Sequence, residues 1–243
     1  MKLLIDIGNT ASKFGVSSNG ELLYLGRMYN KDINYDSIRE LTKDVIDVED
    51  IIISSVAPKI FVTLSKILID FYQIIPRSIV INEDDDFIKI DNKNELGEDL
   101  YADIIAAREI YGSKTAVIDF GTATKILFID QNNVFSSCAI FLGYEKSKNI
   151  LANSTELLPD VSNIKIKPIS DCHNTVDVIN SSAYYSQLYT VKGLIKKYED
   201  EVGYKVNVVI TGGNSIDFLH EFSKEHYDEY LLLKGLNIIS ERR

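Results

Sequence analysis

The chain begins with Met1-Lys2-Leu3-Leu4-Ile5-Asp6-Ile7-Gly8-Asn9-Thr10-Ala11-Ser12-Lys13-Phe14-Gly15-Val16. An apolar run reaches a single carboxylate at Asp6, turns at Gly8, and continues as a second apolar run that contains Lys13. This pattern predicts two antiparallel strands joined by a tight turn. We therefore expect the chain to open with a β-hairpin, to which the following segments add.

The turn has the residue types of a phosphate-binding loop. Gly8 lets the backbone approach a bulky anion, and the side chains of Asn9 and Thr10 add hydrogen-bond donors. Lys13 would supply a positive charge, and Asp6 is placed to hold Mg²⁺ through water. The same residues also fit an ordinary hairpin, in which Asp-x-Gly-Asn only favours the turn.

A second copy of the pattern favours the phosphate-binding interpretation. It reads Thr115-Ala116-Val117-Ile118-Asp119-Phe120-Gly121-Thr122-Ala123-Thr124-Lys125-Ile126-Leu127-Phe128-Ile129, which is again strand, Asp-x-Gly-Thr, lysine and strand. Asp6 and Asp119 lie about half a chain apart. The repeat predicts two related halves, residues 1–113 and 114–243, that face one phosphate chain between them.

Hydrophobic periodicity predicts the remaining elements. In the first half we expect a third strand at 21–28, strands at 51–56 and 78–81, and helices at 37–45, 58–72 and 99–111. In the second half we expect strands at 115–119, 123–129, 134–141 and 206–210, and helices at 144–156, 174–200 and 214–224. A short strand and a helix lead to the C-terminus. Asn174 and Thr175 are expected to cap the longest helix, and Asn214 or Ser215 the next one.

Composition narrows the class of protein. The 243 residues are 45% hydrophobic, which is typical of a globular domain, and the apolar runs are too short for a membrane helix. The formal charge of −10, from 36 acidic and 26 basic residues, argues against a nucleic-acid partner. We find no secretory signal before the first strand, so we expect a cytoplasmic location. Cys138 and Cys172 are expected to be free thiols, with Cys138 buried in a strand.

Two further segments complete a pattern that is specific in order and spacing. Glu95-Leu96-Gly97-Glu98-Asp99 lies between the two loops, and Ile210-Thr211-Gly212-Gly213-Asn214 lies near the end of the chain. Together the four segments resemble the type III pantothenate kinases, which belong to the acetate kinase, sugar kinase, heat-shock protein 70 and actin superfamily. The resemblance implies an α/β fold of two ribonuclease-H-like half domains with mixed sheets, each starting with a βββ unit.

The resemblance also implies an ATP site. It implies that the loop containing Asp6, Gly8, Asn9, Thr10 and Lys13 wraps the ATP phosphates, with Mg²⁺ held by Asp6 through water. In the second loop, it implies that Gly121 and Thr122 contact ATP and that Asp119 coordinates a monovalent cation, K⁺ or NH₄⁺.

A third implied region is the site of the acceptor alcohol. The segment Gly97, Glu98, Asp99 and Leu100 would contact pantothenate, with Asp99 as the catalytic base. Thr175 would contact pantothenate from the partner side of a homodimer. Asp99 also fits a purely structural role, as an acid that stabilises the start of a helix.

Several positions depart from the family pattern. The arginine that follows the catalytic aspartate in the family is Leu100 here, a substrate-contacting tyrosine is Ile90, and a loop proline is Lys93. One charged donor for the substrate carboxylate is therefore missing, and Lys93 is a candidate to replace it. The phosphate-binding residues match the family, whereas the acceptor pocket is altered.

These observations lead to one main hypothesis and two alternatives. The first is ATP-dependent phosphorylation of pantothenate to 4'-phosphopantothenate, the first step of coenzyme A biosynthesis. The second keeps phosphoryl transfer but changes the small alcohol acceptor. The third is a catalytically weak relative that binds nucleotide or a metabolite and has an accessory regulatory role.

Overall fold

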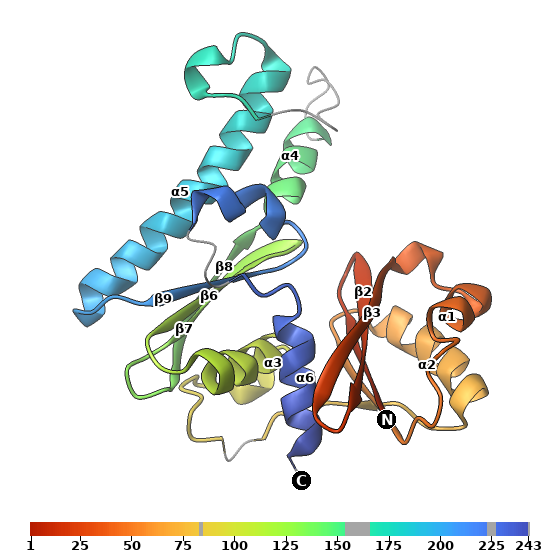
Figure 1. Ribbon diagram of the computed structural model, residues 1–243. Coiled ribbons are helices and arrows are strands. Elements are labelled where there is room, and N and C mark those ends of the chain that lie inside the picture. Colours follow the sequence, from red (N-terminus) through yellow and green to blue (C-terminus); the bar gives the residue numbers. More distant parts are fainter. Residues whose placement is uncertain (83–84, 154–165, 223–226, 243) are drawn as a thin grey trace. The chain divides into compact units, whose positions relative to one another are not determined.

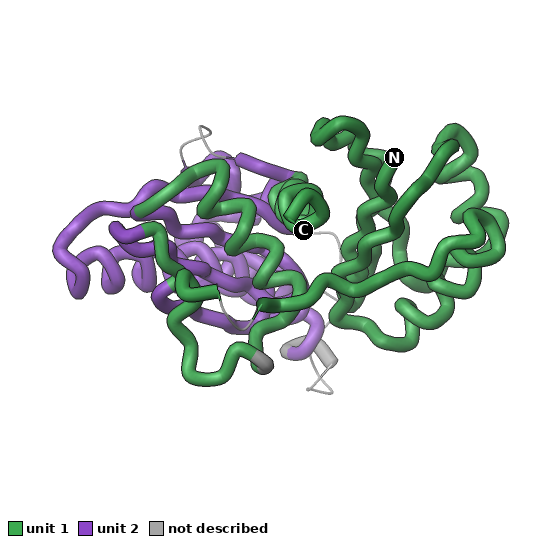
Figure 2. The backbone as a smooth tube through the Cα atoms, turned by 90° about the horizontal axis from the view of Figure 1, so that it is seen from below, with its two compact units in different colours: residues 1–113, 133–135, 230–243 green, residues 114–132, 136–229 purple. Residues whose placement is uncertain are grey.

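Two mixed β-sheets, one in each of two units of the chain, carry the fold. The computed structural model describes residues 1–82, 85–153, 166–222 and 227–242 (Figure 1). Unit 1 consists of residues 1–113, 133–135 and 230–243, and unit 2 of residues 114–132 and 136–229 (Figure 2). Unit 1 first gives way to unit 2 after Ser113, and the C-terminal helix belongs to unit 1.

The sheet of unit 1 begins with the predicted hairpin. Strands β1 (Lys2–Ile7), β2 (Ala11–Ser18) and β3 (Glu21–Tyr29) pair antiparallel in sequence order. Strand β4 (Asp50–Ser55) then pairs parallel with β1, and the short β5 (Arg77–Ser78) pairs parallel with β4. The resulting order, β3-β2-β1-β4-β5, places β1 in the centre and the turn after it at the carboxyl edge.

The helices of unit 1 start at recognisable signals. Helix α1 (Tyr35–Leu41) begins with a capping box between Asn34 and Ser37, and α2 (Pro58–Tyr72) begins with its proline. Both helices contribute side chains to a core beneath the sheet, among them Ile38 and Leu64. Helix α3 (Glu98–Ala106) continues as a π-helical turn (Ala107–Tyr111).

The sheet of unit 2 repeats the same plan. Strands β6 (Thr115–Phe120) and β7 (Ala123–Ile129) pair antiparallel, and β8 (Phe135–Leu142) lies next to β7. Strand β9 (Asn207–Thr211) pairs parallel with β6, as β4 does with β1. The order β8-β7-β6-β9 matches four of the five strands of unit 1. The expected pair of mixed sheets, each starting with a βββ unit, is therefore confirmed.

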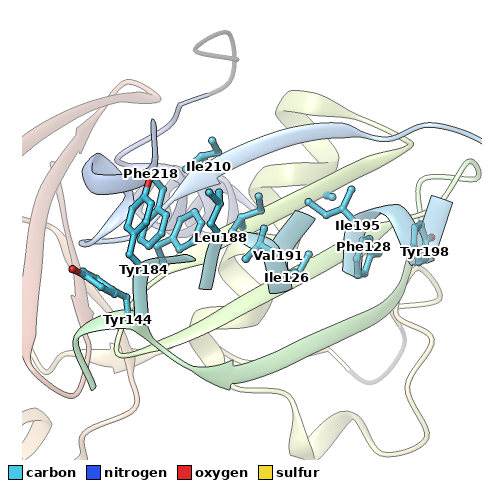
Figure 3. Close-up of a cluster of buried hydrophobic side chains, with 13 residues drawn as sticks. Ile126, Phe128, Tyr144, Tyr184, Leu188, Val191, Ile195, Tyr198, Ile210 and Phe218 are labelled. Carbon is cyan, nitrogen blue, oxygen red and sulfur yellow. The ribbon is translucent and has the colours of Figure 1, made fainter. Parts of the chain in front are cut away.

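One long helix covers the sheet of unit 2. Helix α5 (Thr175–Val202) places apolar side chains at alternating spacings of three and four residues on the sheet (Figure 3), namely Tyr184, Leu188, Val191, Ile195 and Tyr198. Phe218, from the 3-10 helix Ser215–Glu221, stacks between Phe120 and Tyr184 with ring centroids 4.4 and 4.8 Å away. Helix α4 (Tyr144–Asn153) packs beside α5.

Most predicted elements agree with the structure, and a few ends differ. Helix α1 ends at Leu41 rather than residue 45, and β5 has two residues rather than four. The helix expected at 214–224 is a 3-10 helix up to Glu221. The last residues of the helices expected at 144–156 and 214–224 lie outside the described residues.

Two further expectations have definite outcomes. Cys138 and Cys172 are both free, but Cys138 is exposed, so the prediction that it is buried in a strand is wrong. In β8, Ser137 and Cys138 are both exposed, and partly buried and exposed positions alternate from Cys138 to Leu142. Among the described residues, no helix combines the length and the apolar character that crossing a membrane requires.

Candidate active site

The first loop joins β1 to β2 in unit 1. The strand register places Asp6 opposite Lys13, with both side chains partly buried. The turn between them is closed by a 3.1 Å hydrogen bond from the backbone N–H of Gly8 to the carbonyl of Ala11. A Cβ on Gly8 would lie 3.0 Å from that same carbonyl oxygen, so the turn favours glycine on steric grounds. Asn9 and Thr10 are exposed at its tip.

Asn30, which the sequence analysis did not single out, holds this loop in place. Its side-chain amide donates to the carbonyl of Gly8 at 2.8 Å, and its side-chain oxygen accepts from the buried hydroxyl of Ser12 at 2.9 Å. Its backbone N–H donates to the carbonyl of Thr10 at 3.0 Å. Three bonds from one residue therefore hold the backbone of the first loop and the side chain of Ser12.

The segment expected to contact the acceptor lies at the same edge of the sheet of unit 1. Gly97 is the N-cap of α3, and the Glu98 carboxylate accepts from the backbone N–H of Ser55 at 2.9 Å. Ser55 ends β4 and is the register partner of Ile7, directly before the first loop. Glu98 also accepts a hydrogen bond from the hydroxyl of Ser78, at the end of β5. The structure thus brings residues 97–100 to the carboxyl ends of β1, β4 and β5.

Burial and hydrogen bonding act against each other on Glu98. Burial raises the pKa of its carboxyl above the ordinary value, while the hydrogen bonds from Ser55 and Ser78 lower it and the charge of Asp99 raises it further. The net shift is upward. Glu98 therefore anchors the start of α3 at the cost of partly desolvating its charged form.

Asp99 and Leu100 differ in what they can contribute. One carboxylate oxygen of Asp99 accepts from the backbone N–H of Leu100 at 2.8 Å, and the side chain remains partly exposed. Leu100 is 8% exposed and packs in the interior. Lys93, the candidate for the missing charge, is partly buried and donates to the carbonyl of Asp85 at 2.7 Å.

The second loop joins β6 to β7 in unit 2. The register again places the aspartate opposite the lysine, and Asp119 and Lys125 form an ion pair of 3.0 Å, with side chains 15% and 14% exposed. Gly143 donates from its backbone N–H to the carbonyl of Thr122 at 3.1 Å. Gly121 lies in the turn between Asp119 and Lys125. The segment after β8 therefore packs directly on the loop.

The segment after β9 also packs on the second loop. Asn214 donates from its backbone N–H to the carbonyl of Phe120 at 2.9 Å and from its side chain to the carbonyl of Gly121 at 3.3 Å. Gly212 has φ +98°, and a Cβ there would collide with Asp119 and Phe120. Asn214, one of the two residues expected to cap the following helix, occupies its N-cap position, but its side chain makes no cap hydrogen bond.

Thr175 lies at the start of α5 in unit 2. It is exposed at the first position of α5, where the Asn174 side chain accepts from the N–H of Asp177 at 3.0 Å and so acts as the expected cap. The first side chain of α5 in the core stripe, Tyr184, comes nine residues later, which is roughly 13 Å along a helix. The expected role of Thr175 at a dimer contact stays a prediction.

The residues fit the two expected ions differently. In the described parts of the chain, no three His, Cys, Asp or Glu side chains gather at one place. A single carboxylate at Asp6 suits Mg²⁺, which retains water and binds mainly to substrate phosphates. At Asp119 one carboxylate oxygen already bonds the Lys125 ammonium, and Gly212 lies against the other. That position fits an added monovalent cation poorly.

Comparison with known proteins identifies the family of the chain. The family model for type III pantothenate kinase matches residues 2–197. A type III pantothenate kinase of Ehrlichia ruminantium is 32% identical over 96% of both chains, and one of Listeria monocytogenes is 30% identical over 100% of this chain and 97% of its own. Two solved structures share the fold: a protein of Campylobacter jejuni described as a Baf-family transcriptional activator (19% identity, TM-score 0.56) and a Sinorhizobium meliloti protein described as a 2-dehydro-3-deoxygalactonokinase (10%, 0.57). Each covers 96% or more of both chains. The chain belongs to the type III pantothenate kinase family.

Proposed function

We propose that this protein transfers the γ-phosphoryl group of ATP to the primary hydroxyl of pantothenate. The products are ADP and 4'-phosphopantothenate, and the reaction is the first step of coenzyme A biosynthesis. The observation that carries the proposal is the match of the chain to the type III family from the first loop to residue 197. Both Asp-x-Gly loops, each with a lysine opposite its aspartate, support it.

In this proposal the first loop binds the ATP phosphates. Gly8, Asn9 and Thr10 offer backbone and side-chain donors, and Lys13 neutralises phosphate charge. Asp6 holds Mg²⁺ through water, and the ion would neutralise charge on the transferring group. In the second loop, Gly121 and Thr122 contact ATP. Asn30 and Asn214 act as positioning residues, because they hold the glycine carbonyls of the two loops.

The acceptor would bind against residues 97–100. Asp99 accepts the proton of the pantothenate hydroxyl. The hydroxyl oxygen of pantothenate bonds to the γ-phosphorus of ATP, and the bond between the γ-phosphorus and ADP breaks. Gly97 and Glu98 set the position of Asp99 by fixing the start of α3, and Leu100 contributes only apolar contact. Thr175 contacts pantothenate from the partner side of a homodimer.

We further propose a cytoplasmic enzyme whose partners are its small substrates and a second copy of itself. The net charge of −10 supports the exclusion of nucleic acid. Sedimentation velocity tests the dimer directly. A monomer at working concentrations would remove Thr175 from the site.

An ADP-release assay with pantothenate tests the proposed reaction, and mass spectrometry of the product identifies 4'-phosphopantothenate. We expect turnover that requires both Mg²⁺ and pantothenate. Folded protein that binds ATP without turnover would instead support the catalytically weak relative with an accessory role.

The buried Leu100 favours one alternative acceptor class. Since an apolar side chain in the interior cannot bond a carboxylate, a small alcohol without a carboxylate is the second candidate. A panel of primary alcohols, with pantetheine beside pantothenate, separates the two. A higher kcat/KM for pantetheine would favour this second candidate.

A further inference from the structure

The contact between Asp119 and Lys125 bears on the monovalent cation expected at this carboxylate. The Lys125 ammonium lies 3.0 Å from one oxygen of Asp119, and both side chains are about 85% buried. The bond follows from the fold, since the register of β6 and β7 places the two residues directly opposite each other. Cross-strand neighbours of opposite charge attract, so the pair belongs to the folded hairpin itself.

The other side of the carboxylate leaves little room for a second cation. Gly212 packs against the remaining oxygen of Asp119 so closely that a Cβ there would collide with it. A free cation on the same carboxylate would also lie near the Lys125 charge. Two like charges about 4 Å apart at an effective dielectric constant near 20 repel enough to weaken binding by roughly 10²–10³-fold.

We infer that the Lys125 ammonium takes the place of the monovalent cation at Asp119, so that this protein binds nucleotide and turns over without K⁺ or NH₄⁺. A lysine ammonium is chemically an ammonium ion attached to the chain, with the same charge and the same N–H donors. It therefore balances Asp119 beside the phosphate-binding loop as NH₄⁺ would. The statement about turnover rests on the proposed function, whereas the statement about cation binding does not.

Thermal unfolding of the whole protein tests cation binding without any substrate. Melting curves are compared in KCl, NH₄Cl and tetramethylammonium chloride at equal ionic strength, since tetramethylammonium is too large for a carboxylate site between strands. A specific ion that binds only the folded state raises the melting temperature. We expect the same melting temperature in all three salts. A rise specific to K⁺ and NH₄⁺ would overturn the inference.

Removing the lysine charge should create a requirement for the ion. Lys125→Met keeps a side chain of similar length, but it leaves the Asp119 carboxylate buried without its cation. In tetramethylammonium we expect this variant to bind a fluorescent ATP analogue at least about tenfold more weakly than the parent protein. K⁺ or NH₄⁺ should restore most of that affinity and raise the melting temperature of the variant.

Two controls make the result specific. Lys125→Arg keeps the charge, and its ATP-analogue affinity and melting temperature should stay independent of K⁺. This variant still tests the inference if Lys125→Met fails to fold. Lys197→Met removes an exposed lysine that pairs with Glu201 on α5. Its melting temperature should depend on the three salts in the same way as that of the parent protein. If Lys125→Met loses affinity and no ion restores it, Lys125 acts as an ordinary phosphate ligand and the inference is wrong.

The same salts distinguish this inference from the proposed function. If the parent protein phosphorylates pantothenate only when K⁺ is present, the proposed function holds and the inference fails. If it phosphorylates nothing while its melting temperature ignores K⁺ and that of Lys125→Met responds to it, the proposed function fails and the cation statement holds.

Discussion

The side-chain amide of Asn30 donates a 2.8 Å hydrogen bond to the carbonyl of Gly8, across 22 residues of sequence. The second loop has a matching hydrogen bond, in which the side-chain amide of Asn214 donates to the carbonyl of Gly121 at 3.3 Å. Asn30 directly follows β3, whereas Asn214 follows β9. Both halves therefore hold the glycine of their loop with an asparagine amide, although the two asparagines occupy different positions in the repeat.

The first prediction concerns Asn30→Ala. The substitution removes the donor to Gly8 and leaves the hydroxyl of Ser12, which is fully buried, without its acceptor. A buried polar group left unsatisfied costs about 1–3 kcal/mol of stability. We expect the free energy of unfolding in urea to fall by that amount. The KM for ATP should also rise, because the loop backbone is no longer fixed.

A double-mutant cycle with Ser12→Ala separates the two effects of Asn30. If the Ser12 hydroxyl is the orphaned group, Asn30→Ala combined with Ser12→Ala should lose less stability than the sum of the single variants. The KM for ATP should stay high in the double variant, since the bond to Gly8 is still missing. Strict additivity in stability would show that the Ser12 contact matters little.

The second prediction concerns Asp99→Asn. An amide at this position still accepts the hydrogen bond from Leu100, so we expect only a small loss of stability, about 0.3–1 kcal/mol from the helix start. As the proposed base, Asp99 should contribute roughly 10²–10⁴-fold to kcat, with the KM for ATP nearly unchanged. Steady-state kinetics decide between the roles. A variant as fast as the parent protein would leave Asp99 only its structural role.

The sheets and loops could be predicted from sequence because their signals are local. An apolar run that reaches Asp6 or Asp119, a glycine two positions later and a second apolar run specify strand, turn and strand without reference to the remainder of the chain. The sequence also contains one lysine in each copy of the pattern, Lys13 and Lys125. The direct opposition of each lysine to the aspartate depends on strand register, which the structure supplies.

The roles of Asn30 and Asn214 could not be predicted for a physical reason. Each asparagine acts on a carbonyl that is remote in sequence, 22 residues away in one case and 93 in the other. Asparagine after a strand also fits an ordinary turn or helix cap, and the local sequence predicts only the cap position for Asn214. Only the folded backbone shows which acceptor each amide reaches.

The third prediction concerns the pH dependence that Glu98 gives to stability. Since burial raises the pKa of its carboxyl in the folded chain, the folded chain holds this proton more tightly than the unfolded chain does. Glu98 therefore favours folding at low pH. This contribution is lost as the pH rises from its ordinary pKa, near 4.5, through the raised one. Glu98→Gln should remove that dependence, measured as urea midpoints between pH 4 and pH 7 at about half-unit steps.

Glu98→Ala is the control for the hydrogen bond from Ser55. Glutamine keeps an oxygen acceptor for the Ser55 N–H, whereas alanine removes it. We expect Glu98→Ala to be less stable than Glu98→Gln at every pH. Equal stabilities would mean that water replaces the Glu98 acceptor without cost.

The fourth prediction compares two glycines inside helices, Gly235 of α6 (Leu231–Glu241) and Gly193 of α5. In a helix interior, glycine is about 1 kcal/mol less favourable than alanine. Gly193 has open space around it, so Gly193→Ala should stabilise the protein by about 0.5–1 kcal/mol.

Gly235→Ala should have the opposite sign. A Cβ there would run into the backbone carbonyl of Ala102 in α3, which cannot rotate away as a side chain can. Overpacking of this kind costs about 1–3 kcal/mol, which exceeds the gain in helix propensity. The loss would loosen the contact of α6 with α3, whose first residues carry Glu98 and Asp99. Urea unfolding of both variants, with the parent protein, measures the two signs in one experiment. If Gly235→Ala stabilised the protein as Gly193→Ala does, α3 and α6 would have to pack less closely than the structure shows.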